Sequence, residues 1–153
     1  MKSIVFCTSP LIIRAVLAQE GAYESLVYDN SPPIEEFYPD VKNKVWLLLQ
    51  EGARTAGLIM LEPLNNVLWQ PHIIIFEKYR GSGSENWGRL AAQYMKYTYR
   101  AQKLIALTPY LSAKHYAERM GFKYVGMLTQ SIMKDGQLMD QYMLEHNLRG
   151  RIQ

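Results

Sequence analysis

A short apolar run followed at once by a glycine-rich turn constrains this chain more than any other feature. Ile73–Phe76 predicts a buried strand, and Tyr79–Ser84, with the sequence Tyr-Arg-Gly-Ser-Gly-Ser, comes shortly after it. An amphipathic stretch begins just beyond the turn. A strand that ends in such a turn and opens a helix presents free backbone N–H groups at the positive end of the helix dipole. This arrangement favours a bound phosphate or diphosphate.

Two common phosphate-binding motifs do not match these residues. The dinucleotide fingerprint requires a third glycine where this chain has Asn86. The nucleotide-triphosphate loop requires a Gly-Lys-Ser/Thr sequence, which the chain lacks. A glycine turn that joins a strand to a helix without binding any ligand remains the alternative.

The composition predicts a single domain over residues 1–153 with a short polar tail at 147–153. The chain has 153 residues, 48% of them hydrophobic, which suits one full core. Its 17 basic and 14 acidic residues give a formal charge of +3 and are spread without the Lys/Arg cluster of a nucleic-acid-binding surface. No apolar run is long enough to cross a bilayer, and the amino terminus lacks the features of a signal peptide. We therefore expect a cytoplasmic protein that binds neither nucleic acid nor membrane.

Cysteine and histidine usage predicts neither a disulfide nor a metal site. The single cysteine, Cys7, lies in an apolar run, which indicates a buried thiol. No pair of His, Cys or carboxylate residues has a metal-ligand spacing, and no Ser/His/Asp order suggests a hydrolase. We expect no metal.

The periodicities predict strands and helices along the whole chain. Strands are expected at 4–7, 45–49, 55–61, 67–76, 103–107, 122–133 and 138–145, and helices at 11–17, 87–98 and 113–120. Ser9-Pro10 predicts the start of the first helix, and Gly121 predicts the end of the last one. The three strands over 45–76 form an expected antiparallel meander. Asp135-Gly136 predicts a tight hairpin turn near the carboxyl end.

Two segments and the order of elements resemble the GCN5-related N-acetyltransferases. Arg80 and Gly83 match the Arg/Gln-x-x-Gly-x-Gly/Ala pattern of that family, and Glu85 replaces its last Gly or Ala. Thr108–Phe122, with Ala113 at the expected alanine and a Gly-Phe ending, is similar to the second motif of the family. The resemblance covers nearly the whole chain, and it includes divergent members encoded by tailed bacteriophages. It implies an α/β (α+β) acyl-CoA N-acyltransferase fold, with a mixed central sheet of about seven strands flanked by helices.

The resemblance also implies that acetyl-CoA or another acyl-CoA binds where the fourth and fifth strands part. Backbone groups near two strand residues would hold the pantetheine arm, and amides of the turn would receive the diphosphate. The residues expected at the cofactor are Ile75, Phe76, Arg80, Gly81, Ser82, Gly83 and Ser84. Glu85 opposes this expectation, because Ser82-x-x-Glu85 predicts a capping box whose carboxylate would occupy the same donors.

The candidate catalytic residues are His72 and Tyr116. His72 lies in mid-strand, and an imidazole can take a proton from an ammonium group. Glu62 and Glu77 are reserve bases. The family commonly uses a Tyr four residues before the Gly of the Gly-Phe pair, where this chain has Ala117, and the adjacent Tyr116 would point about 100° away around the helix.

Aromatic and methionine side chains are abundant in this sequence. Four aromatic residues lie in a loop-rich segment that is expected to cover the acceptor side of the cleft, where they would contact a peptide or another protein. They are Tyr23, Tyr28, Phe37 and Tyr38. The methionines of the last hairpin are expected to pack on the sheet, with a dimer face as the alternative, and they are Met127, Met133, Met139 and Met143.

Two functions remain open. The first is an N-acyltransferase that uses acyl-CoA and an amine acceptor on a small molecule, peptide or protein, with direct attack of the amine on the thioester. The second is a GCN5-fold bacteriophage protein without catalysis, which acts as a virion assembly or accessory factor and binds viral structural proteins. A phage-encoded chain would work in the host cytoplasm. A chain can keep the fold of a family without keeping its activity, so the resemblance does not decide between these two functions.

Overall fold

A computed structural model describes residues 1–150, which form strands and helices along their whole length. The strands are Lys2–Phe6 (β1), Val45–Glu51 (β2), Arg54–Pro63 (β3), Leu68–Ile75 (β4), Lys103–Thr108 (β5), Lys123–Lys134 (β6) and Gln137–Asn147 (β7). The α-helices are Pro10–Leu17 (α1), Ala22–Leu26 (α2), Glu85–Thr98 (α3) and Leu111–Met120 (α4), and Ile34–Glu36 (η1) and Glu77–Tyr79 (η2) are 3-10 turns. All the predicted strands and helices are present. The sequence patterns do not predict α2, because five residues are too few to show a helical period.

Local signals decide where the first and last helices begin and end. Ser9 is the N-cap of α1, where its Oγ accepts a hydrogen bond from the Ile12 N–H at 3.3 Å, and Pro10 is the first helical residue. Gly121 ends α4 in the left-handed conformation, with φ at 107°. Both predictions are confirmed.

The strands of residues 1–150 form one sheet in the order β1-β2-β3-β4-β5-β7-β6. The meander β2–β4 is antiparallel as predicted, with Leu47 opposite Ile59 and Met60 opposite His72. Strands β4 and β5 run parallel and, within the described residues, pair only at Leu68 with Lys103 and Trp69 with Leu104. Beyond Trp69 the two strands therefore separate.

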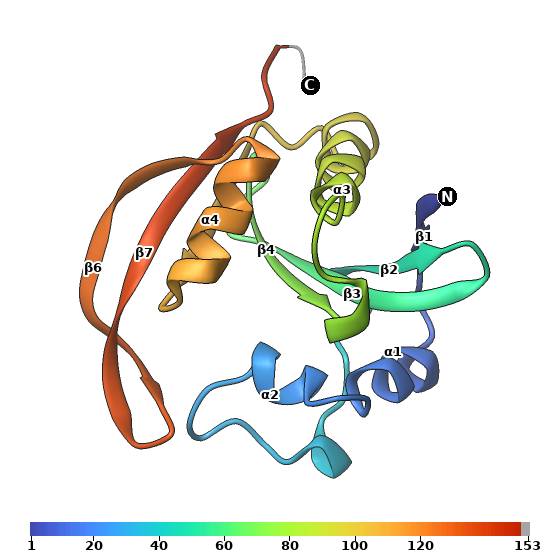
Figure 1. Cartoon of the computed structure of the whole chain (residues 1–153), viewed down its shortest axis with the longest axis horizontal. Coiled ribbons are helices and arrows are strands. Elements are labelled where there is room, and N and C mark those ends of the chain that lie inside the picture. The colour runs from blue at the N-terminus through green and yellow to red at the C-terminus, as the bar shows by residue number, and fades with distance from the viewer. Residues whose placement is uncertain (151–153) are drawn as a thin grey trace.

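Helices cover both faces of the sheet (Figure 1). On one face, side chains of α3 and α4 such as Trp87, Met95 and Ala117 pack with Leu47 of β2. On the other face, side chains of α1 and α2 pack with Ile74 of β4 and with Phe76, which directly follows this strand. Because the central strands are buried on both faces, they appear in the sequence as nearly continuous apolar runs.

The carboxyl end forms the predicted hairpin of β6 and β7. Asp135 and Gly136 have φ values of 51° and 74°, which is the conformation that a two-residue hairpin turn requires. The structure differs at the expected polar tail: β7 continues to Asn147, and the side chain of Leu148 is buried in the core. Its N–H donates to the Gln102 carbonyl at 2.9 Å, so the chain stays packed beyond 147, while residues 151–153 lie outside the described part.

Candidate functional site at the gap between β4 and β5

One edge of β4 has backbone groups that face the gap. The Phe76 N–H donates to the Ala56 carbonyl of β3 at 2.8 Å, and residues of an antiparallel strand alternate between the two neighbouring sides. Ile73 and Ile75 therefore direct their N–H and C=O groups away from β3, toward the side where β5 has separated. Ile75 thus faces the gap, where its carbonyl accepts a hydrogen bond from Arg80 Nε at 2.8 Å. The backbone N–H of Phe76 is engaged with β3 instead, and strand alternation identifies Ile73 as the second gap-facing residue.

The glycine turn adopts a conformation that depends on its two glycines. Gly81 and Gly83 have φ values of 119° and 86°, which side chains with a Cβ rarely adopt. Within the turn, the Ser84 N–H donates to the Gly81 carbonyl and the Asn86 N–H donates to the Gly83 carbonyl, both at 3.1 Å. Among residues 1–150, the N–H groups of Gly81, Ser82, Gly83 and Glu85 have no protein partner. These donors are the ones that an anion would use.

The predicted capping box does not form. Ser84, rather than Ser82, is the N-cap of α3, and no side chain of the described residues caps this helix end. The reason is the turn itself, because the positive φ values of Gly81 and Gly83 delay the start of the helix until Glu85. Glu85 is then the first helical residue. Its carboxylate interacts favourably with the helix dipole there, but it forms no hydrogen bond with the amides of the turn. The objection that Glu85 occupies the donors is therefore removed.

Arg80 connects the turn to β4. Its Nε donates a hydrogen bond to the Ile75 carbonyl at 2.8 Å. The guanidinium group thus lies at the end of the strand, beside an open hollow that is also lined by Glu20, Glu77 and Lys78. Glu77, the second reserve base, is exposed at this hollow. Arg80 supplies positive charge at the point where the turn begins.

His72 lies on the same face of β4 as Ile74, the face covered by α1 and α2. Its Nε2 is 2.9 Å from Oε1 of Glu62, and the other oxygen of Glu62 is 3.5 Å from the Lys44 ammonium. The hydrogen bond to His72 is the main cause that lowers the pKa of Glu62, and Lys44 adds to it. The two side chains, each 29% exposed, form a pair three residues beyond the last contact of β4 with β5. Glu62 and His72 are separate candidates in the sequence, and the register of β3 and β4 brings their side chains into contact.

Tyr116 holds the turn from α4. Its hydroxyl donates to the Ser84 carbonyl at 2.8 Å. Burial and the nearby Glu85 carboxylate raise the pKa of Tyr116 well above its ordinary value. Ala117, at the position of the family's usual tyrosine, is 5% exposed in the core. The structure thus joins Tyr116 to the start of α3.

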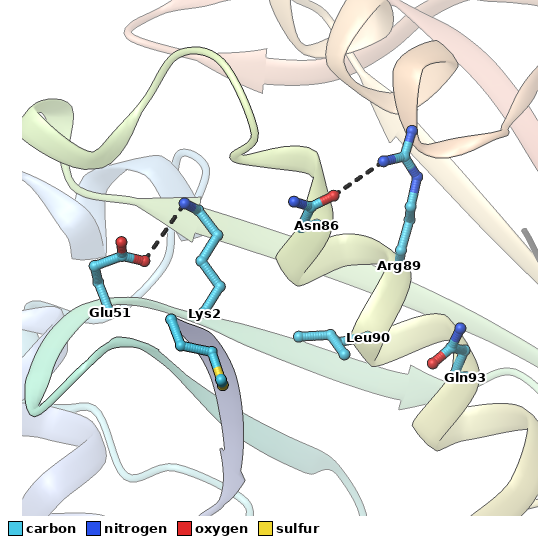
Figure 2. A pocket seen from close by; sticks show the side chains of 7 residues that line it. Lys2, Glu51, Asn86, Arg89, Leu90 and Gln93 are labelled. Carbon is cyan, nitrogen blue, oxygen red and sulfur yellow. Dashed lines mark hydrogen bonds and ion pairs between the residues drawn. The ribbon is translucent and has the colours of Figure 1, made fainter.

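A second open hollow, of about 430 Å³, lies between β1 and α3 (Figure 2). Its walls carry Lys2, which is 3.4 Å from Glu51, and Arg89, whose Nη1 donates to Asn86 at 3.0 Å. The remaining lining residues are Met1, Leu90 and Gln93. Because β1 is the far edge of the sheet from the gap, this hollow is separate from the His72–Glu62 pair.

The aromatic residues expected at the acceptor side divide into two groups. Tyr23 is 5% exposed and packs its ring against Phe37, so both contribute to the core beneath α1 and α2. Tyr28 and Tyr38 are 60% and 74% exposed. Of the predicted contact residues, these two are available at the surface. None of the helices over residues 1–150 is long and apolar enough to span a lipid bilayer.

Comparisons with known proteins agree with this geometry at the level of the fold. The sequence matches no family model and no curated protein. Solved structures do match. Spermidine N-acetyltransferase from Vibrio cholerae, in complex with CoA and spermine, has a TM-score of 0.78 at 14% identity, with 96% of this chain and 95% of that chain covered. Ribosomal-protein-S5-alanine acetyltransferase from Vibrio fischeri has a TM-score of 0.77 at 9% identity, with 97% and 93% covered.

These likenesses extend over almost the full length of both partners. The identities are too low to transfer an activity, whereas shared topology over whole chains defines a fold. The predicted fold class is confirmed. The chain has the acyl-CoA N-acyltransferase fold of the GCN5-related N-acetyltransferases.

Proposed function

We propose that this protein is an acyl-CoA-dependent N-acyltransferase that transfers an acyl group, acetyl in the first instance, to a primary amine. The observation that carries the proposal is the arrangement along one strand. The glycine turn, which has amides without a protein partner among residues 1–150, lies at the carboxyl end of β4. Ile73 and Ile75 face the gap, and the His72–Glu62 pair lies nearer the point where β4 and β5 part. A candidate diphosphate site and a candidate proton acceptor thus lie along one strand, at whose edge the Ile75 carbonyl accepts from Arg80.

The residues of the turn suit the diphosphate of acyl-CoA. Amides of Gly81, Ser82 and Gly83 supply donors at the positive end of α3, and Arg80 supplies a cation. Beyond the last pair with β5, the backbone of Ile73 and the N–H of Ile75 can bind the pantetheine amides as an added strand would be bound, while the Ile75 carbonyl accepts from Arg80. Acyl-CoA brings the thioester, and the chain itself orients it between β4 and β5.

His72 is the proposed general base. A primary amine is protonated near neutral pH and must lose a proton before it can attack a carbonyl carbon. If the Glu62 carboxylate accepts the proton of Nε2, the lone pair is on Nδ1 and is available to the ammonium group. Glu62 thereby selects the tautomer and holds the ring in place.

The departing thiolate needs little assistance from the protein. A cysteine thiol has a pKa of about 8.5, and thiols in general are far more acidic than alcohols, so the thiolate is a good leaving group compared with an alkoxide. This property is compatible with Ala117 at the position of the family's usual acid. We assign Tyr116 to positioning, because its hydroxyl is bonded to the Ser84 carbonyl and so fixes α4 against the turn.

The acceptor is proposed to be an amine on a small molecule, peptide or protein. Both similar structures described above are enzymes that acetylate amines, and one of them is a complex with CoA and spermine. In this chain the acceptor would approach His72 from the face covered by α1 and α2. A viral origin and viral structural partners belong to the alternative in which the fold has lost its chemistry.

Calorimetric titration with CoA and acetyl-CoA tests the first half of the proposal. Binding should stabilise the domain by about 2.7 kcal/mol when the ligand is at a hundredfold excess over its dissociation constant. Gly83→Ala should weaken binding, because the turn requires a positive φ there. If neither CoA nor acetyl-CoA binds, the transferase proposal fails and the assembly role is favoured.

Release of free CoA thiol in the presence of an amine tests the second half. His72→Ala should lower kcat by about 10²-fold to 10³-fold while CoA affinity stays within about twofold. The matched control is His115→Ala, because His115 also contacts a glutamate, Glu118, at 3.2 Å but lies exposed on α4. Equal turnover of both variants and the wild type would exclude His72 as the base.

A further inference from the structure

The tip of the β6–β7 hairpin is bonded to the loop that follows α2. The Asp29 carboxylate accepts from the Asp135 N–H at 2.9 Å with one oxygen and from the Gly136 N–H at 2.8 Å with the other. The Asp29 N–H donates to the Met133 carbonyl at 3.1 Å, and the Lys134 ammonium donates to the Glu24 carbonyl at 3.1 Å. Asp29 and Asp135 are 106 residues apart in the sequence. We call this set of contacts the Asp29 clasp.

The hairpin reaches the loop because β7 is longer than its partner β5. Strand β5 pairs with β7 as far as Thr108 opposite Tyr142, which leaves Gln137–Gln141 beyond the end of β5. Five strand residues span roughly 17 Å. Figure 1 shows the tip of the β6–β7 hairpin beside the loop that follows α2. The Asp29 clasp is therefore at the open end of the gap between β4 and β5.

Together these contacts close a ring around the acceptor side of the gap. At the vertex, β4 meets β5 at Trp69 and Leu104. On one side, Ala22 and Tyr23 pack α2 against β4. On the other side, β5 is bonded to β7, and the Asp29 clasp joins the hairpin tip to the chain that leaves α2. An acceptor that approaches His72 from the face of α1 and α2 must pass within this ring.

We propose that Asp29 is a specificity-determining residue, which keeps the ring closed so that only an amine on a slender chain reaches His72. The inference rests on the proposed transferase function. A carboxylate that accepts two backbone N–H groups forms charge-assisted bonds, which are stronger than neutral ones. The lysine side chains of a folded protein project only a short distance from a broad surface, so the closed ring excludes them more than it excludes a linear amine.

The test compares two acceptors in the wild-type protein and in Asp29→Ala. One acceptor is a linear alkyl diamine, and the other is a folded, lysine-rich protein. Specificity is the ratio of the two kcat/KM values. Wild type should favour the diamine strongly, and Asp29→Ala should reduce that ratio by about tenfold or more, because the tip is released.

Asp40→Ala is the matched control. Asp40 also accepts from two backbone N–H groups, those of Lys42 at 3.2 Å and Asn43 at 2.9 Å, but both lie in its own loop. Hydrogen exchange of the Asp135 and Gly136 amides gives a readout that does not depend on activity. These amides should exchange faster in Asp29→Ala and at the wild-type rate in Asp40→Ala.

The outcomes separate this inference from the proposed function. If the tip amides are released in Asp29→Ala but the acceptor ratio is unchanged, the clasp does not set specificity and the inference is overturned. Free exchange of the tip amides in the wild type would overturn it as well. If CoA does not bind and neither amine is acetylated, the transferase function fails, and the inference fails with it, whatever the exchange data show.

Discussion

The meander β2–β4 and the hairpin β6–β7 are both antiparallel, yet they are stabilised in different ways. Leu47, Leu48 and Leu49 of β2 are at most 7% exposed although they alternate between the two faces, because helices cover both. Strand β6 is the edge of the sheet and carries Val125 at 51% and Met127 at 45% exposure. The meander is stabilised by burial on both faces. Strand β6 is stabilised largely by hydrogen bonds to β7, and the tip of the hairpin by hydrogen bonds to Asp29.

This difference matters because the two regions form opposite walls of the proposed site. The wall that carries His72 belongs to the meander, whose strands are buried between helices on both faces. The opposite wall ends in a hairpin whose tip depends on the Asp29 clasp. Local stability follows buried apolar contact, so we expect the hairpin to open at a lower free energy than the meander. The proposed site thus lies between a wall buried on both faces and a wall whose tip depends on a few hydrogen bonds.

Alanine substitution at one glycine in each region should show the largest contrast. A Cβ at Gly57 of β3 would lie 2.0 Å from the Ile74 carbonyl oxygen, and its φ is 153°, so strain and overlap should cost on the order of 4 kcal/mol. A Cβ at Gly126 of β6 would meet no atom within 4 Å among the described residues, so Gly126→Ala should change stability by about 0.5 kcal/mol or less. Urea unfolding monitored by circular dichroism measures both. Similar costs at the two sites would contradict the contrast.

Truncation of one leucine in each region should give the next largest effect. Leu47 is fully buried in β2, so Leu47→Ala should cost about 3 kcal/mol through lost burial and a residual cavity. Leu128 of β6 is 37% exposed, and Leu128→Ala should cost about 1 kcal/mol or less. The same unfolding experiment measures the two values. A large loss of unfolding free energy in Leu128→Ala would show that β6 is covered in solution, and the two regions would then not differ in burial.

Neutralising one carboxylate in each region should give the smallest effect, and in the meander this effect should depend on pH. The pKa of Glu62 is lowered from its ordinary 4.5, first by the hydrogen bond with His72. A lowered pKa adds stability that is present above the ordinary value and is lost as pH falls through the folded-state value. Glu62→Gln should therefore cost about 1 kcal/mol at pH 7 and less near pH 3.

Glu145 of β7 provides the control for that measurement. It pairs with Lys103 at 3.0 Å, and the two side chains are 42% and 37% exposed. An ion pair this exposed adds little, so Glu145→Gln should change stability by about 0.5 kcal/mol or less. Urea unfolding at the two pH values tests both variants. A Glu62→Gln cost that stays constant with pH would show that packing, and not charge, explains it.

Sequence patterns predicted those parts of the fold that depend on near neighbours. Ser9-Pro10 begins α1, and Asp135-Gly136 turns the hairpin, because these residue types satisfy a helix start and a type I′ turn within a few positions. The Arg-Gly turn likewise follows its strand as expected. The apolar runs of the meander identified central strands, since burial on both faces removes the usual alternation.

The errors arose where the outcome depends on distant contacts. The capping box at Ser82 and Glu85 was a reasonable pattern, but the conformation of the two glycines moved the helix start to Ser84. The methionines of the hairpin were expected to pack on the sheet, yet Met127 and Met133 are 45% and 42% exposed, because β6 is the edge strand. Leu148 was placed in a polar tail and is instead buried.

By itself the sequence determined the order of elements, the turn chemistry and hence the class of fold, because these follow from periodicity and from residues with restricted backbone geometry. Only the tertiary structure decided that Glu62 pairs with His72, that Ile73 faces the gap, and that Asp29 bonds the hairpin tip. Strand register and loop docking set these contacts. Both depend on the summed packing of many residues, which no short stretch of sequence encodes.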